Sequence, residues 1–363
     1  MKKKEYQPLR LMVGIMGGLR LGERRKDTEG RGYLHAVCKR VGGNGRWQKA
    51  YHARPRWLET VMKPHIWRIH AQLLGMALIW GAAWTWGRIV AQAMPPLTAA
   101  SLRFLISTVF LLLWLYHRDR LRALTALNRR QWAGLALAAA CGVSGYAIFF
   151  MLGLRHIGAG RAAVIFSINP ALTMLGAAWL FGERLNRRIL CGMALAVGGS
   201  LIVAARGNPL LLFATIGAGE WLIFGCVACW VSYSLLGRRV LTGIDALTAT
   251  TATALIGGAM LFVISLASEG TAAWASLAHV APPVWATLLA LALGATLLCY
   301  LWYFEGIAAL GAGNAAAYMT LIPFIAVLIA AGWLGEPLTL SLVSGGALTI
   351  GGMALMHSGR GKA

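Results

Sequence analysis

Two prolines stand near the middle of long apolar stretches, 153 residues apart: Pro170 in SINPAL and Pro323 in TLIPFI. A proline inside a helix removes a backbone hydrogen bond and kinks the chain. In a membrane the freed carbonyl must then face protein or a wet cavity. Kinks at matching points of two related halves therefore indicate the central site of a solute carrier, with helix packing as the alternative. Asn169 adds a polar side chain at the depth of Pro170, where the second half has Ile322.

Aromatic side chains form a second group of candidate site residues. Trp80 and Trp84 lie one helical turn apart in the first apolar stretch, and Trp230 and Tyr233 form a similar stripe in the sixth. With Tyr146 they predict a cavity lined by rings, which suits a partly apolar organic solute. Rings that face lipid or fill a core are the more common case, so packing is the alternative for each.

Arg103, Glu220 and Glu305 are ionisable residues within or at the edges of apolar stretches. Arg103 lies about six residues inside its stretch, where a cation costs about 3 kcal/mol on insertion scales. Such residues pair, reach toward the interface or serve function. Glu220 and Glu305 could titrate during a transport cycle, although anchoring at the membrane surface is the commoner role. All three are candidates for coupling or gating.

The motifs of enzyme, nucleotide and metal chemistry are missing from the sequence. No GxxxxGK[ST] phosphate loop occurs, so we expect no ATP hydrolysis by this chain, and no ATPase subunit is implied. HExxH, GxSxG and the kinase motifs are missing too. Cys226 and Cys229 form a CxxC, but no further Cys or His cluster is near enough in sequence to complete a zinc site. We predict a protein without catalysis, cofactor or bound metal.

These residues stand in a chain that is too apolar to face water over most of its length. Hydrophobic residues make up 58% and charged residues 13% of it, against about 25% charged in a soluble domain. A helix needs about 20 residues to cross the hydrocarbon layer, and lipid requires its backbone groups to be paired internally. We predict an all-α integral membrane protein with ten transmembrane helices, near residues 71–91, 97–116, 132–152, 162–181, 189–205, 218–237, 246–267, 284–304, 315–334 and 339–356.

The second half of the chain repeats the first. Residues 153–203 and 306–356 are identical at 18 of 51 aligned positions, among them Glu183 and Glu336. A second match, at an offset of 150, relates Arg88 in the first stretch to Arg238 in the sixth. The duplication predicts a first repeat at 69–205, a linker at 206–217 and a second repeat at 218–358.

Basic residues lie mostly in alternate loops between the predicted helices. The loops expected inside carry Arg118, Arg120, Arg122, Arg129, Arg130, Arg184, Arg187, Arg188, Arg238 and Arg239, whereas the outer loops carry only Arg155, Arg161 and Arg206. This bias places both termini in the cytoplasm, and it accounts for the net charge of +22 without a nucleic-acid partner. Because each repeat holds five spans, an odd number, the two five-helix repeats must be inverted relative to each other.

Residues 1–61 differ from the rest of the chain, since they are basic, rich in glycine and without sustained periodicity. They hold 15 of the 34 Lys and Arg residues, and such a segment cannot form a core alone. Three interpretations compete: a disordered tail on anionic lipid, a nucleic-acid-binding arm, or an extension ahead of the true start. We favour the last, because Met62 is followed by Lys63 and Pro64 and then directly by the first predicted helix.

Several motifs together resemble those of a known family: IWGAAW, SLRFL, GAGRAA…NP…LFGERL with GMALAVGGSLIV, and GAGNAA…IP…LGEPL. Over residues 69–358 they are similar to the EamA family of the drug/metabolite transporter superfamily. The resemblance implies two inverted five-helix units, a cavity formed chiefly by helices one, three, four, six, eight and nine, and export of amino acids or other small metabolites. On those helices it points to the aromatic, proline and asparagine candidates above and adds Tyr318.

We therefore expect a carrier of the bacterial inner membrane that exports an amino acid or similar metabolite by alternating access, with its oligomeric state left open. A cavity rich in aromatic rings and poor in carboxylates favours a zwitterionic or neutral solute. A multidrug cation exporter ranks lower, because such proteins typically keep a Glu in the first helix and this one has none. From a different class, a membrane scaffold or an intramembrane enzyme is the alternative, and solute flux separates these from a carrier.

Overall fold

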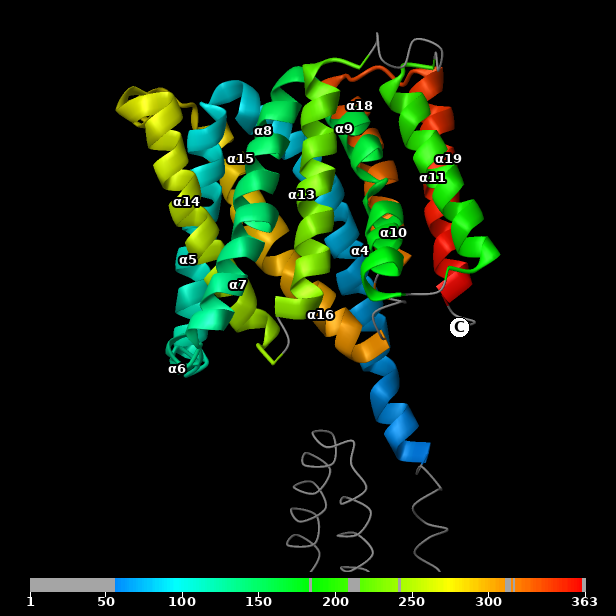
Figure 1. The fold of residues 1–363 in the computed structure, drawn as a ribbon, viewed down its shortest axis with the longest axis horizontal. Helices are drawn as coiled ribbons and strands as arrows, with labels where there is room; N and C mark the ends of the chain where they lie inside the picture. The colour runs from blue at the N-terminus through cyan, green and yellow to red at the C-terminus, as the bar shows by residue number, and fades with distance from the viewer. Residues whose placement is uncertain are drawn as a thin grey trace, which may run out of the picture. The chain divides into compact units, whose positions relative to one another are not determined.

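The computed structural model describes residues 56–182, 185–207, 216–240, 243–310, 315 and 317–360 (Figure 1). The regular elements of this part of the chain are helices, and no strand occurs among them. The chain divides into two compact units, Met1–His65 and Ile66–Ala363, and the second contains the apolar helices. Of the predicted tail, residues 1–55 lie outside the described residues, and 56–61 form the first turns of α4 (Arg56–Ala93).

Nine helical segments of the described chain are long and apolar enough to cross a membrane. They are α4 from Ile66 onward; α5 (Pro96–His117); α7 (Arg129–Ala139), η1 (Ala140–Gly145) and α8 (Tyr146–His156) together; α9 (Ala159–Phe166) with α10 (Asn169–Phe181); α11 (Arg187–Ala204); α13 (Ala218–Val240); α14 (Ala246–Ala275) with η3 (Ser276–His279); α15 (Pro282–Leu289), η4 (Ala290–Leu298) and α16 (Cys299–Leu310) together; and α19 (Leu340–Arg360). A short helix, α6 (Arg122–Thr125), lies between α5 and α7.

The ninth predicted stretch is the exception to this count. There η5 (Tyr318–Leu321) and α18 (Ile322–Leu334) form a shorter apolar helix, because residues 311–314 and 316 lie outside the described part of the chain. The other nine predicted stretches coincide with the nine candidate spans. A helical multi-span membrane protein is therefore confirmed; the described residues contain nine candidate spans and one shorter apolar helix, and the count of ten stays a prediction.

Local sequence signals explain several helix ends. Asn128 caps α7, accepting a hydrogen bond from the backbone of Gln131, whose side chain bonds back to the backbone of Asn128. Asn186 caps α11 by accepting a hydrogen bond from the backbone N–H of Ile189, without a bond in return. At the other end of a helix, Gly182 follows α10 with φ +68°, a left-handed conformation that glycine adopts without strain.

Helix boundaries repeat along the chain at the offsets found in the sequence. The helix α5 begins at Pro96 and α14 at Ala246, while η1 begins at Ala140 and η4 at Ala290, both 150 residues on. With the larger offset of 153, α10 (Asn169–Phe181) corresponds to α18 (Ile322–Leu334) residue for residue. The Gly335 that ends α18 is left-handed like its counterpart Gly182. The internal duplication is thus present in the helix boundaries as well as in the amino-acid sequence.

Helices at corresponding positions pack against each other, and α11 against α19 is the clearest case. A Cβ on Gly192 would lie 2.6 Å from the carbonyl oxygen of Gly352, and one on Gly199 would lie 2.4 Å from that of Gly345. The two backbones therefore touch directly, as membrane helices do where small residues replace hydrophobic driving force. The counterparts α5 and α14 also pack against each other, and α18 packs against α9, the helix that precedes its counterpart α10.

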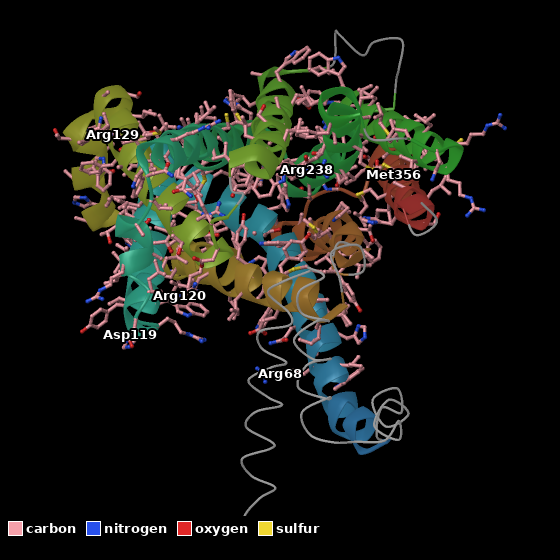
Figure 2. All side chains as sticks on the ribbon, turned by 60° about the horizontal axis from the view of Figure 1, so that its bottom comes forward. Arg68, Asp119, Arg120, Arg129, Arg238 and Met356 are labelled. Atoms are coloured by element: carbon pink, nitrogen blue, oxygen red, sulfur yellow. The ribbon has the colours of Figure 1, made fainter. Side chains whose placement is uncertain are left out.

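Exposed arginines gather at one end of the bundle. In Figure 1 the helices α5, α10 and α13 end at the lower end of the bundle, and exposed arginines near these helix ends include Arg120, Arg129, Arg187 and Arg238. Figure 2 labels three of them among the side chains drawn. At the opposite end, Arg155 and Arg206 are exposed, whereas Arg88 and Arg161 are partly buried and engaged with helix termini.

Candidate functional site

The two predicted prolines stand at helix breaks rather than inside continuous helices. The helix α9 ends at Phe166, Ser167 and Ile168 form a turn, and α10 begins with Pro170 in its first turn. In the second half, the tighter η5 gives way to α18, with Pro323 again in the first turn. A proline there sacrifices no hydrogen bond, because the first N–H groups of a helix have no partner within it. The expected kinks are thus realised as two interrupted helices.

Four of the predicted aromatic residues meet in one group of rings. Ring centroids lie 5.2 Å apart for Tyr146 and Trp230, and 5.6 Å apart for Trp230 and Tyr233. Trp84 joins them through Phe150 at 5.1 Å and Phe166 at 5.3 Å. These separations are typical of favourable ring pairs. The central aromatic cluster consists of Trp84, Tyr146, Phe150, Phe166, Trp230 and Tyr233.

Phe150 and Phe166 are members of this cluster that sequence reasoning missed. Phe166 is the last residue of α9 and so lies directly at the helix break. Phe150 stacks on Tyr146 at 5.6 Å. The only sequence signal for Phe166 is its position four residues before Pro170, where the proline frees its carbonyl. No sequence signal marks Phe150, because it does not differ from the other apolar residues of its helix.

Trp80 and Tyr318 lie in other surroundings. The ring of Trp80 contacts Tyr300 and Tyr303, each at 5.8 Å, and its indole N–H donates to the carbonyl of Ala295 at 2.8 Å. Tyr318 forms a hydrogen bond with His70 on α4. Neither residue has a ring contact of its own with the central aromatic cluster in the described part of the chain. Asn169, also expected at the site, is buried and accepts a hydrogen bond from Thr173 at 3.0 Å.

Two π-helical segments at corresponding positions border these rings, and the sequence did not predict them. The segment η1 ends at Gly145, directly before Tyr146, and η4 includes Ala295, the acceptor for Trp80. A π-helical turn widens the backbone and disturbs regular hydrogen bonding, and such turns are frequent at functional sites. Alanine and glycine make up about half of each segment, with leucine equally common in η4, and this composition does not distinguish π from α helix.

Arg103 is buried in α5, with 8% of its surface exposed. Its Nη2 lies 3.4 Å from the hydroxyl of Thr296 in η4, and its guanidinium carbon lies 5.2 Å and 5.7 Å from the ring centres of Phe104 and Phe150. It therefore does not reach out to the interface, which was one of the roles expected for it. It borders the central aromatic cluster through Phe150.

Glu220 serves as a helix cap. Its side chain is 1% exposed and accepts a hydrogen bond from the N–H of Gly217 at 3.0 Å, at the start of α13. Arg161 Nε lies 3.3 Å and Arg206 Nη2 3.9 Å from the same carboxylate. Arg161 in turn donates to the carbonyls of Val203 and Ala204 at the end of α11. The group joins three helix ends, which is a structural arrangement.

Glu305 lies on α16 and accepts a hydrogen bond from Gln72 Nε2 of α4 at 3.0 Å. The amide oxygen of Gln72 has no hydrogen-bond partner among the described residues. Together with the bond between His70 and Tyr318, this contact ties α4 to the second half of the chain. The geometry places Glu305 away from the ring contacts of the central aromatic cluster.

Arg88 and Glu336 form an ion pair that was not expected from the sequence. Their Nε and Oε1 atoms are 3.4 Å apart. Arg88 donates to the carbonyls of Leu154 and Ile157 at the end of α8, and Glu336 accepts from the backbone of Ala159 at 2.7 Å, at the start of α9. Both residues belong to the repeat matches, which was the available signal. Glu183, the counterpart of Glu336, lies outside the described residues.

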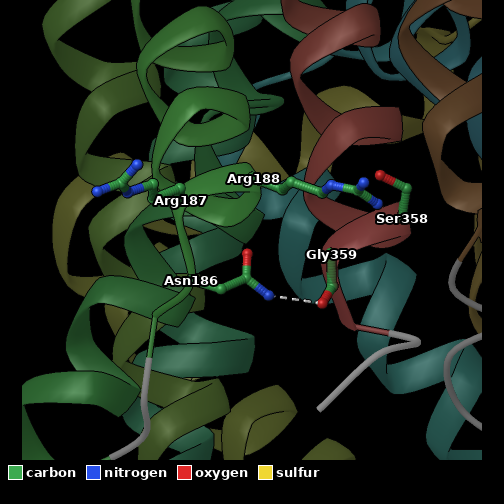
Figure 3. Close-up of a pocket in the computed structure, with 5 residues that line it drawn as sticks. All are labelled: Asn186, Arg187, Arg188, Ser358 and Gly359. Atoms are coloured by element: carbon green, nitrogen blue, oxygen red, sulfur yellow. Dashed lines mark hydrogen bonds between the residues drawn. The ribbon is translucent and has the colours of Figure 1, made fainter.

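A surface hollow lies at the start of α11 and the end of α19 (Figure 3). Its lining residues are Asn186, Arg187, Arg188, Ser358 and Gly359. Asn186 Nδ2 donates to the carbonyl of Gly359 at 2.8 Å, and this bond is drawn in the close-up. The hollow contains none of the predicted site residues, so the candidate site remains the cluster of rings at the helix break.

Apolar helices of membrane-spanning length, interrupted beside a cluster of aromatic rings, are the architecture of a multi-pass membrane transporter for small solutes. The chain belongs to the EamA-like transporter family, whose model matches residues 67–205 and 217–358.

Individual relatives agree with this assignment. The uncharacterized transporter YyaM of Bacillus subtilis is 27% identical over 286 residues, covering 78% of this chain and 92% of YyaM. A probable terminal-alkyne amino-acid exporter of Streptantibioticus cattleyicolor is 29% identical over 224 residues, or 61% of this chain and 72% of that one. The uncharacterized inner membrane transporter YhbE of Escherichia coli is 26% identical over 171 residues, or 46% and 53%.

A solved crystal structure resembles this one with a TM-score of 0.57. The match covers 79% of this chain and 96% of the other at 19% sequence identity. At this identity the similarity concerns the fold alone.

Proposed function

We propose that this transporter exports an amino acid or a related small metabolite across the bacterial inner membrane by alternating access. The observation that carries the proposal is the position of the central aromatic cluster, which includes the last residue of α9, Phe166, and the first residue after η1, Tyr146. Rings beside interrupted backbone offer both apolar surface and polar groups to a solute. The similarity to a relative named as a probable amino-acid exporter supports this substrate class.

The proposed membrane arrangement is ten helices in two inverted repeats, 69–205 and 218–358, joined by the linker 206–217. In Figure 1, α10 ends at the lower end of the bundle and its counterpart α18 at the upper end, which supports the inversion. The shorter helix Tyr318–Leu334 supplies the tenth span. The end rich in exposed arginines faces the cytoplasm, because basic loops are retained there, and this orientation puts both termini inside.

In this arrangement the helix breaks serve as hinges. The segments α9 and α18 pack against each other, so the interrupted helices of the two halves meet. Rocking of one half against the other about these breaks would expose the cluster to one side of the membrane and then to the other. The solute would be held by rings from α4, α8, α9 and α13 during the change.

Flux of labelled amino acids into inverted membrane vesicles tests the proposal. We expect uptake that depends on the protein, and a loss of about tenfold or more in Trp230→Leu, since ring stacking and burial contribute about 1–3 kcal/mol. Trp179→Leu is the matched control, because Trp179 is 84% exposed on α10 and touches lipid in the proposed arrangement. Wild-type vesicles without flux for any amino acid would refute this substrate class.

A multidrug cation exporter is the second candidate. The first span contains no Glu to attract a cation, and the buried Arg103 beside the cluster would repel one. Resistance of cells to cationic dyes on overproduction would favour this candidate. A scaffold would give neither resistance nor flux, and an intramembrane enzyme would give product without flux.

A further inference from the structure

The guanidinium of Arg103 is a buried charge without a counter-ion in the described part of the chain. Its Nε atom has no hydrogen-bond partner there, and its Nη2 reaches only the hydroxyl of Thr296, at a long 3.4 Å. The carboxylates near membrane depth are engaged elsewhere: Glu220 with Arg161, Glu336 with Arg88, Glu269 with the backbone of Leu97 and Thr98, and Glu305 with Gln72. A buried cation of this kind is costly and is retained where function needs it.

Arg103 also lies between the central aromatic cluster and the surroundings of Trp80. On one side it faces Phe150, which stacks on Tyr146 and contacts Trp84. On the other side it contacts η4 through Thr296, next to the Ala295 carbonyl that binds Trp80. The neighbouring turn of α5 is fixed to η4 as well, since Ser107 donates to the carbonyl of Ala292 at 2.9 Å. The arginine is therefore held at the border of the central aromatic cluster and a π-helical segment.

We propose that Arg103 binds the carboxylate of the transported solute. This assignment rests on the proposed function and deepens it. A guanidinium presents parallel N–H groups that fit a carboxylate with two hydrogen bonds, and a low-dielectric site strengthens the pairing. The rings beside it would receive an apolar side chain. The corresponding residue 150 positions on is Thr253, so only one half of the chain offers a cation, and the site takes a single carboxylate.

A purely structural role for Arg103 makes different predictions. If its contacts with Phe104 and Phe150 stabilised the fold, Arg103→Met would lower the unfolding temperature. If the charge is kept for the solute, the same change leaves the unfolding temperature equal or higher, because an apolar residue replaces an unpaired buried ion. In that case carboxylate binding would be lost in Arg103→Met although the protein stays folded.

Binding is best measured on the purified full-length protein in detergent, by quenching of its tryptophan fluorescence. The probes are L-phenylalanine and L-phenylalaninamide, which differ in the carboxylate, each titrated without and with added sodium chloride in a buffer free of carboxylates. The variants are Arg103→Met, Arg103→Gln and Arg103→Lys, and Arg129→Gln is the control at an exposed arginine. A charge-assisted hydrogen bond is worth a factor of about ten or more in affinity.

We expect L-phenylalanine to bind the wild type and Arg129→Gln at least tenfold more tightly than the amide, and Arg103→Met and Arg103→Gln to lose this preference. Arg103→Lys should keep part of it, because the charge remains while the paired geometry does not. Weakening in chloride alone, without preference for the acid over its amide, would show an inorganic anion site and overturn the assignment. Equal preference in all variants would overturn it too.

The same variants in inverted vesicles separate this assignment from the proposed function. Flux of amino acids that is unchanged in Arg103→Gln would uphold the function and remove the role of the arginine. Arg103-dependent binding of L-phenylalanine without flux of any amino acid in the wild type would uphold the site and remove the function. A fall of the unfolding temperature in Arg103→Met, with no rescue in Arg103→Lys, would assign the residue to the fold.

Discussion

Glu220 and Arg161 show how single charged residues are used at one end of the bundle. Glu220 caps the start of α13, and Arg161 of α9 donates to the end of α11. The two side chains form an ion pair in which the carboxylate is buried and the guanidinium partly buried. Helix N-termini favour negative charge and C-termini positive charge. At the residue scale, a structural charge differs from the charge proposed to bind solute: Glu220 forms ion pairs with Arg161 and Arg206, whereas Arg103 has no carboxylate partner among the described residues.

Glu220→Gln is expected to destabilise the protein by about 1–3 kcal/mol, because the partly buried charge of Arg161 loses its carboxylate partner. Thermal unfolding in detergent measures this change. The exposed Asp119→Asn, at the other end of the bundle, is the control and should have little effect. A folded Glu220→Gln protein whose transport loses its dependence on pH would instead return Glu220 to the coupling role considered from the sequence.

At the same scale, residue types allowed a partial prediction of the candidate site. Trp84, Trp230 and Tyr233 were proposed from spacing and Tyr146 as a further aromatic residue within a span, and the structure brings their rings together. Trp80 was proposed on the same grounds but lies with other tyrosines, because residues one turn apart on a helix can face different neighbours. Which phenylalanines complete the cluster depends on packing between distant helices, and spacing along one helix contains no information about that.

At the scale of elements, Asp245 caps α14 outside the spans. It accepts hydrogen bonds from the backbone N–H of Thr248 at 3.2 Å and from its hydroxyl at 2.6 Å, and Arg120 lies 3.6 Å away. Partial burial alone would raise its pKa, but the hydrogen bonds from Thr248 and the charge of Arg120 outweigh it and lower the pKa of Asp245 below the ordinary value.

The stabilising effect of this cap is expected to depend on pH. Because the folded-state pKa is lowered, the contribution is fully present above the unfolded pKa of about 4 and is lost as the pH falls through the folded value. Asp245→Ala should lose about 0.5–2 kcal/mol at neutral pH, whereas Asp245→Asn keeps a capping side chain and should show less change below pH 4 than the wild type. Unfolding temperatures between pH 3 and pH 7 check this, and parallel curves for all three proteins would contradict it.

The contact of α11 with α19 offers a test between adjacent residues. A Cβ on Gly199 would meet the backbone of α19, whereas one on Gly198 meets nothing within 4 Å. Gly199→Ala is therefore expected to cost about 1–3 kcal/mol by overpacking, and Gly198→Ala to be neutral or slightly stabilising in a helix. Unfolding in detergent compares the two. Equal effects would mean that the helices do not approach as described.

Element types could be predicted from the apolar runs, and element details could not. Nine of the ten runs are helices of spanning length in the described part of the chain. The π-helical segments η1 and η4, however, are conformations that alanine and glycine permit but do not demand, so their placement is decided by neighbours. The same applies to Pro170, which could kink a helix or begin one, and in this fold begins one.

At the scale of the whole molecule, the inverted arrangement is open to a direct labelling test. In a cysteine-free background, Arg187→Cys and Leu338→Cys place single thiols at exposed positions after α10 and after α18. We expect a membrane-impermeant maleimide to label Leu338→Cys from the periplasm and Arg187→Cys only after the cells are opened. Labelling of both from the same side would exclude the inversion and the alternating-access scheme that depends on it.

Two helix caps connect the two halves of the chain. The first half of the chain takes two of its caps from the second: Glu269 of α14 for α5, and Glu336 beyond α18 for α9. A ribosome that has made only the first half has therefore produced α5 and α9 without the carboxylates that cap them. We expect that nascent piece, expressed alone, to be degraded, and to survive when the remaining piece is supplied as a separate polypeptide.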